Sequence, residues 1–187
     1  MARNAEPDLR IPSWSREAGD VMIAHVKAIP ACALVDFTAA AAGFRDAMAG
    51  NTPEHGLLAA AERLLLAART TEDFLRLVDL INTVRSDALI EPIALAAFTR
   101  WAQADPEAAA RAVDRVDSHQ LKHHLAREVC RIWARRDPEG ALAFLENAPP
   151  GFARRLGPEA VLSVLAETDP ESALARAREW KSESERS

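Results

Sequence analysis

Apolar residues recur at every fourth position in three stretches of the second half of the chain. The recurring residues are Leu89, Ile93, Ala97 and Trp101, then Leu121, Leu125, Val129 and Trp133, and finally Ala153, Gly157, Val161 and Leu165. Because residues four apart lie on one face of an α-helix, each series predicts a helix with a single buried stripe. On this interpretation, Trp101 and Trp133 belong to the core rather than to an aromatic recognition surface.

Each predicted helix is followed by the same triplet, Asp-Pro-Glu. The copies begin at Asp105, Asp137 and Asp169, so they are 32 residues apart. Asp can cap a helix N-terminus, Pro fits the first helical position, and the helix dipole favours Glu in the first turn. Proline also disfavours a helical conformation in the residue before it. Each triplet therefore predicts a sharp corner, at which one helix ends and the next begins.

The fixed 32-residue period divides most of the chain into units of two helices. Aligning the triplets gives three repeats, at residues 86–117, 118–149 and 150–181. Residues 51–85 match them less closely, with a Thr-Pro-Glu triplet at the first corner and Thr-Thr-Glu in place of Asp-Pro-Glu at the second. We interpret this segment as a fourth, degenerate repeat.

Two prolines, Pro92 and Pro158, lie inside the first helices of their repeats. Proline removes a backbone hydrogen bond and clashes with the preceding turn. We therefore expect these helices to begin only near Glu91 and Gly157. Repeat 118–149 has no such proline, so its first helix is expected to be the longest and most regular.

The first 50 residues do not match the repeat. We expect residues 1–12 to be loosely ordered and to precede a helix over residues 13–28. An Ala-rich helix follows over residues 33–49, with Gly50 as its C-terminal stop. The apolar residues of the helix over 13–28 are Val21, Met22, Ile23 and Val26. Because an end repeat needs a cover for its apolar face, residues 1–50 are predicted to form an N-terminal two-helix cap.

The two Trp-Ala-x-x-Asp-Pro-x-x-Ala motifs, at Trp101 and Trp133, resemble those of bacterial helical-repeat proteins related in style to HEAT and tetratricopeptide α-solenoids. The resemblance covers residues 86–181. It implies an architecture and supplies no catalytic residue, and the tetratricopeptide pattern proper is not matched. We therefore predict an all-α fold, a short α-solenoid of about four antiparallel helix-pair repeats with the N-terminal cap. Residues 182–187 are charged and are predicted to be a disordered tail.

Composition narrows the classes of function. The formal net charge is -5, with 27% charged and 49% hydrophobic residues, which gives no general attraction for nucleic acid or an anionic membrane. Cys32 and Cys130 stand alone, without metal-binding or disulfide spacing, which favours reduced thiols. The chain shows neither a signal region nor a membrane-spanning apolar run. We predict a cytoplasmic protein without cofactor or membrane contact.

Repeat 118–149 carries a line of cations on the outer face of its first helix. Arg127, Arg131 and Arg135 are four residues apart, and Arg136 and His123 extend the same surface. Arginine binds carboxylates and phosphates through paired hydrogen bonds, so this ridge could receive an acidic peptide or another anion. The alternative is a solvated helix face with local ion pairs, such as one between His124 and Glu128.

The same helix contains the best candidate for a metal site. His119 and His123 are four residues apart, as in metal sites built on one helix. The equivalent positions of the preceding repeat hold Asp87 and Glu91, whose carboxylates could add ligands. The simpler interpretation is an exposed face on which imidazoles pair loosely with carboxylates.

Three classes of function remain, and we rank them by how much of the sequence each explains. The first is a non-catalytic protein-protein interaction or scaffolding module, whose partner offers an acidic segment to the ridge. The second is binding of nucleic acid through the same arginines, which the negative net charge disfavours. The third is a metal-dependent enzyme that uses His119 and His123. Homo-oligomerisation through an apolar end face with Leu174 and Trp180 is compatible with the first.

Overall fold

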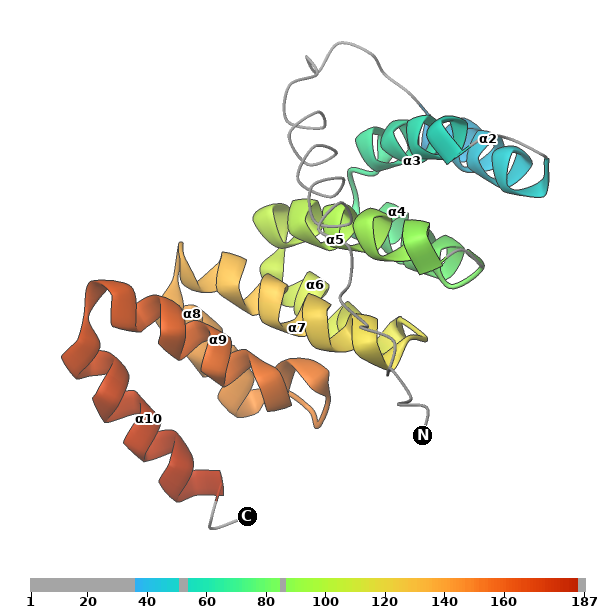
Figure 1. Cartoon of the computed structure of the whole chain (residues 1–187). Coiled ribbons are helices and arrows are strands. Elements are labelled where there is room, and N and C mark those ends of the chain that lie inside the picture. The colour runs from blue at the N-terminus through green and yellow to red at the C-terminus, as the bar shows by residue number, and fades with distance from the viewer. Residues whose placement is uncertain (1–35, 51–53, 85–86, 185–187) are drawn as a thin grey trace, which may run out of the picture.

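The computed structural model describes residues 36–50, 54–84 and 87–184. In these residues the only regular structure is helical, with nine α-helices, one short 3-10 helix and no strand (Figure 1). The helices are α2 (Phe37–Ala49), α3 (Glu54–Ala67), α4 (Thr71–Ile81), α5 (Asp87–Ala104), α6 (Pro106–Ala112), α7 (His119–Ala134), α8 (Pro138–Asn147), α9 (Phe152–Thr168) and α10 (Pro170–Ser184). The prediction of an all-α fold is confirmed.

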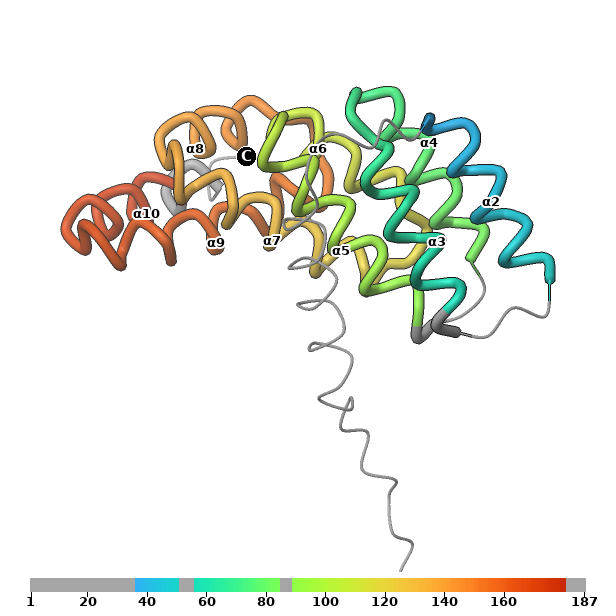
Figure 2. The backbone as a smooth tube through the Cα atoms, turned by 90° about the horizontal axis from the view of Figure 1, so that it is seen from above, coloured from blue at the N-terminus to red at the C-terminus, as the bar shows by residue number. Residues whose placement is uncertain are grey.

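The helices are stacked in two rows. Figure 2 shows α3, α5, α7 and α9 in one row and α4, α6 and α8 in the other. Within the first row, α7 packs against α5 on one side and against α9 on the other. Each chain reversal from the first row to the second takes place at a Thr-Thr-Glu or Asp-Pro-Glu corner, and the core lies between the rows.

The apolar stripes predicted from the fourfold spacing face this core. The buried members are Leu89, Ile93, Ala97, Trp101, Leu121, Leu125, Val129, Ala153, Gly157, Val161 and Leu165. Trp101 is 1% exposed, and its ring stacks on Phe74 with ring centroids 5.2 Å apart. Trp133 is only partly buried and packs beside Phe144 at 5.1 Å. The prediction of an inward orientation is therefore confirmed fully for Trp101 and in part for Trp133.

The three Asp-Pro-Glu corners share one backbone geometry. Asp105, Asp137 and Asp169 have φ/ψ angles of -147/85°, -153/82° and -143/85°. In each corner the aspartate Oδ1 accepts a hydrogen bond from the backbone N–H three residues on, at 2.8–3.0 Å. Thr70 caps α4 in the same way, and Asp73 completes a capping box with it. The corners predicted from sequence are confirmed as capped helix starts.

The expected effect of the two internal prolines is wrong. α5 begins at Asp87 and α9 at Phe152, so Pro92 and Pro158 lie inside continuous helices. Consequently α7, with 16 residues, is not longer than α5, with 18, or α9, with 17. The turns before the prolines remain helical because they carry core side chains. Leu89 is 6% exposed and Phe152 is 9% exposed, and their burial offsets the one backbone hydrogen bond that each proline removes.

The two ends of the described chain also differ from the expected boundaries. Asp36 caps α2 through a hydrogen bond from the N–H of Ala39, at 3.2 Å, so this helix begins at Phe37 rather than near residue 33. It ends at Gly50, as predicted. At the other end, residues 182–184 belong to α10 and are not disordered, because no glycine or proline interrupts the helix after Pro170. The calls on residues 1–12, 13–28 and 185–187 lie outside the described residues.

Candidate binding surface at the helix corners

The predicted ridge on α7 is partly neutralised by carboxylates. Arg127 Nη2 lies 2.9 Å from Glu159 Oε1 on α9. Arg131 donates two hydrogen bonds to Glu128, at 2.9 and 2.6 Å, and these raise the pKa of Arg131 above its ordinary value. These two arginines therefore carry local ion pairs, as the alternative interpretation of the ridge held, although the partners differ from those expected.

The period explains which partners meet. Arg127 and Glu159 are 32 residues apart and occupy equivalent positions, so the stacking of α7 on α9 brings them side by side. Glu91 of α5 likewise reaches α7, where its Oε1 lies 2.8 Å from His124 Nδ1. The expected pair between His124 and Glu128 does not form, because each of the two is held by another partner.

His119 and His123 come together on the ring of one aromatic residue rather than with carboxylates. Both imidazoles lie edge-on to Phe152, each with its ring centroid 5.4 Å away. Lys122 and Arg155 approach the same ring, at 5.5 and 4.6 Å from its centroid. Glu91 is engaged with His124, and in the part of the chain that the structure describes no three potential metal ligands are grouped. The pair of histidines thus lacks the carboxylate from α5 that the metal hypothesis invoked.

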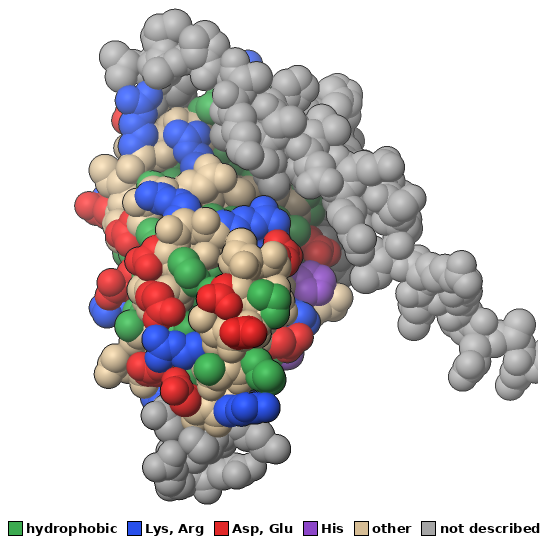
Figure 3. Space-filling model, turned by 90° about the vertical axis from the view of Figure 1, so that its left-hand side faces the viewer, with side chains coloured by type: hydrophobic (Ala, Val, Ile, Leu, Met, Phe, Trp, Pro, Cys, Tyr) green, Lys and Arg blue, Asp and Glu red, His purple; other side chains and the backbone are tan. Residues whose placement is uncertain are grey.

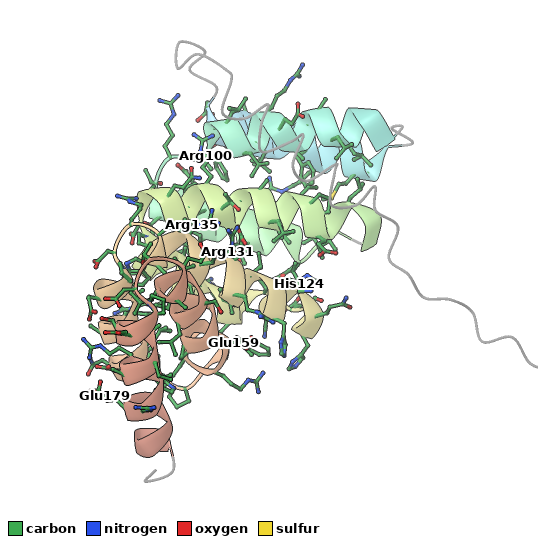
Figure 4. The ribbon with its side chains drawn as sticks, turned by 60° about the vertical axis from the view of Figure 1, so that its left-hand side comes forward. Arg100, His124, Arg131, Arg135, Glu159 and Glu179 are labelled. Atoms are coloured by element: carbon green, nitrogen blue, oxygen red, sulfur yellow. The ribbon has the colours of Figure 1, made fainter. Side chains whose placement is uncertain are left out.

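Arg135 and Arg136 lie where α7 ends. Arg136 Nη1 donates a hydrogen bond to the carbonyl oxygen of Gln103, near the end of α5. The side chain of Arg135 is exposed and makes no hydrogen bond or ion pair with the described residues. Figure 4 shows Arg135 on the same side of the stack as Arg131 and Arg100. Of the predicted ridge, this end alone presents a free guanidinium.

Two further arginines at this surface were missed by the sequence analysis. Arg100, in the last turn of α5, is half-buried, and its Nη2 donates a long hydrogen bond of 3.5 Å to Leu66 O at the end of α3. Burial lowers the pKa of Arg100, and the positive charge of Arg69 lowers it further. Neither has a carboxylate partner among the described residues. The signal available in the sequence was position, since both lie within a few residues of a corner.

We call Arg69, Arg100, Arg135 and Arg136 the corner arginine cluster. Part of their role is structural, because the last carbonyls of a helix lack partners and carry the negative end of its dipole. Arg100 and Arg136 satisfy such carbonyls on the neighbouring helix. Figure 3, which faces the corners, shows Lys and Arg side chains in its upper described part and mostly Asp and Glu side chains lower down. The cations therefore gather at the N-terminal corners of the stack.

The one cysteine in the described residues does not offer a nucleophile. Cys130 is fully buried in α7, and burial raises the pKa of its thiol to about 12. The thiol stays protonated at neutral pH, and only the thiolate is strongly nucleophilic. This buried group is therefore a packing residue.

No protein-family model matches the chain, and neither a curated protein nor a solved structure matches it significantly. None of the helices in the described residues is long and apolar enough to cross a membrane.

Proposed function

We propose that the chain is a short α-solenoid that acts as a non-catalytic protein-binding module, and that its corner arginine cluster receives an acidic segment of the partner. Three observations support the architecture. The corners share one capping geometry, the helices lie in two rows, and helices of the first row pack on their neighbours. In such stacks each repeat buries the apolar face of the next, which leaves an extended surface for a ligand.

The observation that carries the binding surface is the presence of unpaired cations at the corners of an acidic protein. Arg69 and Arg135 are exposed and have no ion-pair partner among the described residues, although the formal net charge of the chain is -5. Arg127 and Arg131, by contrast, are already held by carboxylates. A carboxylate ligand at Arg69 and Arg135 would gain charge-assisted hydrogen bonds without breaking an existing pair.

Arg100 favours the same surface. Its guanidinium is half-buried beside Arg69, and its one hydrogen bond goes to a neutral carbonyl oxygen. An anion placed between Arg69 and Arg100 would relieve the repulsion between them. The cluster is therefore better prepared for an anion than a solvated face would be.

Binding of nucleic acid through the same cluster is the alternative. Arginine recognises phosphate as well as carboxylate, but the face that bears the cluster also bears many carboxylates lower down (Figure 3). A nucleic-acid backbone longer than the cluster would meet these carboxylates. An acidic peptide segment that is short enough to stay at the upper corners would not.

The test compares an acidic peptide with an oligonucleotide. A fluorescent oligoglutamate peptide is titrated with the wild-type protein, with Arg69→Glu/Arg135→Glu, and with a control of the same charge change, Arg76→Glu/Arg111→Glu. Arg76 and Arg111 are exposed on α4 and α6, where they pair with Glu72 and Glu107. We expect the first variant to lose at least about tenfold in affinity, because two charge-assisted contacts are replaced by repulsion. The control should lose less than about threefold, through net charge alone.

Equal losses in the two variants, or no loss in either, would contradict the corner arginine cluster as the site. A single-stranded oligonucleotide is measured in parallel. If it binds the wild-type protein more tightly than the peptide does, and if Arg69→Glu/Arg135→Glu abolishes that binding, the nucleic-acid alternative replaces the proposal.

A further inference from the structure

An apolar groove lies at the N-terminal end of the stack, away from the corners. It has a volume of about 560 Å³ and is formed by α2, α3, α5 and the connection between α4 and α5. Its apolar lining includes Phe44, Met48, Leu57, Val84, Leu89 and Ile93, and Arg45 also lines it. The volume is in the range of grooves that bury most of a bound ligand. The groove thus offers an unfilled apolar surface beside the helix that begins the described chain.

We propose that this groove is the docking site of residues 13–28 of the same chain. The chain outside the described residues includes positions 1–35 and joins the structure at Asp36, the N-cap of α2. The groove is lined by the second half of α2, from Phe44 to Ala49. The segment is therefore tethered to the helix that forms one wall of the groove.

The tether is long enough. α2 has 13 residues, and a rise of about 1.5 Å per residue places its far end about 20 Å from Asp36. Residues 29–35, seven residues between the segment and Asp36, span up to about 23 Å when extended. A segment that turns back at residues 29–35 can therefore lie along α2 and reach the groove.

The sequence of the segment suits an apolar groove. Ala18, Met22 and Val26 are four residues apart, so a helix over residues 13–28 would carry them on one side. Asp20 and Lys27 would lie away from that side. Met22 is unbranched and adapts to irregular apolar surfaces, as this groove requires. The docked segment would complete the cover over α5 that an end repeat needs.

A stability comparison in the full chain tests the proposal. Met22→Asp together with Val26→Asp puts two charges on the apolar side, whereas Lys27→Glu changes the net charge by the same amount on the polar side. We expect the double variant to lower the midpoint of thermal unfolding by about 5–10 °C. Amide hydrogen exchange should rise at Leu89–Ile93 and at Phe44–Ala49. Lys27→Glu should leave both measurements unchanged, and equal effects of the two variants would overturn the proposal.

Photo-crosslinking identifies the occupant directly. p-Benzoylphenylalanine replaces Met22, and the full chain is illuminated at low micromolar concentration before the cross-linked peptides are identified by mass spectrometry. Cross-links within one molecule to Phe44–Ala49 or to Leu89–Ile93 support docking in the groove. Cross-links formed only between molecules would assign the groove to a second copy of the chain. Cross-links only to α8–α10, or none, would also overturn the proposal.

Discussion

Replacing Trp101 by Ala is expected to lower the free energy of unfolding by about 3–5 kcal/mol, the range for a large aromatic side chain removed from a core. The ring is 1% exposed. It stacks on Phe74 with an interplanar angle of 9° and lies 5.7 Å from the ring of Phe98. Loss of the indole would therefore leave a cavity between α4 and α5 that neither helix can close, because both are held by capped corners.

The matched control is the equivalent residue of the next repeat. Trp133 is only partly buried and has one aromatic neighbour, so Trp133→Ala should cost about half as much. Urea unfolding followed by circular dichroism measures both variants. An equal or larger cost for Trp133→Ala would contradict the assignment of Trp101 to the core between the two rows.

A third substitution separates packing from hydrogen bonding at this site. The indole Nε1 of Trp101 is buried without a hydrogen-bond partner. A buried unsatisfied donor costs about 1–3 kcal/mol. Trp101→Phe removes that donor and keeps an aromatic ring beside Phe74, so it should be much less harmful than Trp101→Ala.

Replacing Gly157 by Ala is expected to destabilise the protein by about 1–3 kcal/mol, although the same change elsewhere stabilises helices. A Cβ at Gly157 would lie 2.7 Å from Cys130 Sγ and 2.8 Å from Leu145 Cδ2. Both neighbours are fully buried, on α7 and α8, so neither can move aside cheaply. Glycine is needed here because α9 crosses these helices closely.

Gly43 provides the control for this prediction. It lies inside α2, and a Cβ there would meet nothing within 4 Å. Gly43→Ala should therefore stabilise the protein by about 0.5–1 kcal/mol through helix propensity and the entropy of the unfolded chain. Thermal unfolding of both variants gives the comparison. The same sign for both changes would show that α9 does not cross α7 and α8 as closely as described.

Corners and buried stripes could be predicted from the sequence because each is set by residues close to one another in the chain. Asp105 finds its hydrogen-bond partner three residues away, and Leu121 and Leu125 share a face by helix geometry alone. The starts of α5 and α9 were mispredicted for a different reason. The local penalty of Pro92 and Pro158 was known, but the compensating burial of Leu89 and Phe152 depends on packing.

The candidate site was predicted less well because charges are paired across helices. The spacing of Arg127 and Arg131 showed a ridge, but the carboxylate at Glu159 becomes a partner only once α7 is known to pack on α9. Arg100 was passed over because a single charge beside Trp101 has no periodic signal. Its significance arises from the nearby Arg69, which belongs to another helix pair.

The central claim, a stack of interchangeable 32-residue repeats, is tested most directly by removing residues from the middle of the chain. Deleting residues 97–128 takes out one period and splices α5 to α7, so that Leu89, Ile93, Val129 and Trp133 keep their fourfold spacing. Deleting residues 97–126 takes out 30 residues and turns the second half of the spliced helix by roughly 200°. We predict that the first variant keeps its helix content per residue and unfolds cooperatively, whereas the second loses cooperative unfolding. Equal stability of the two variants, or equal loss of structure in both, would contradict the repeat architecture.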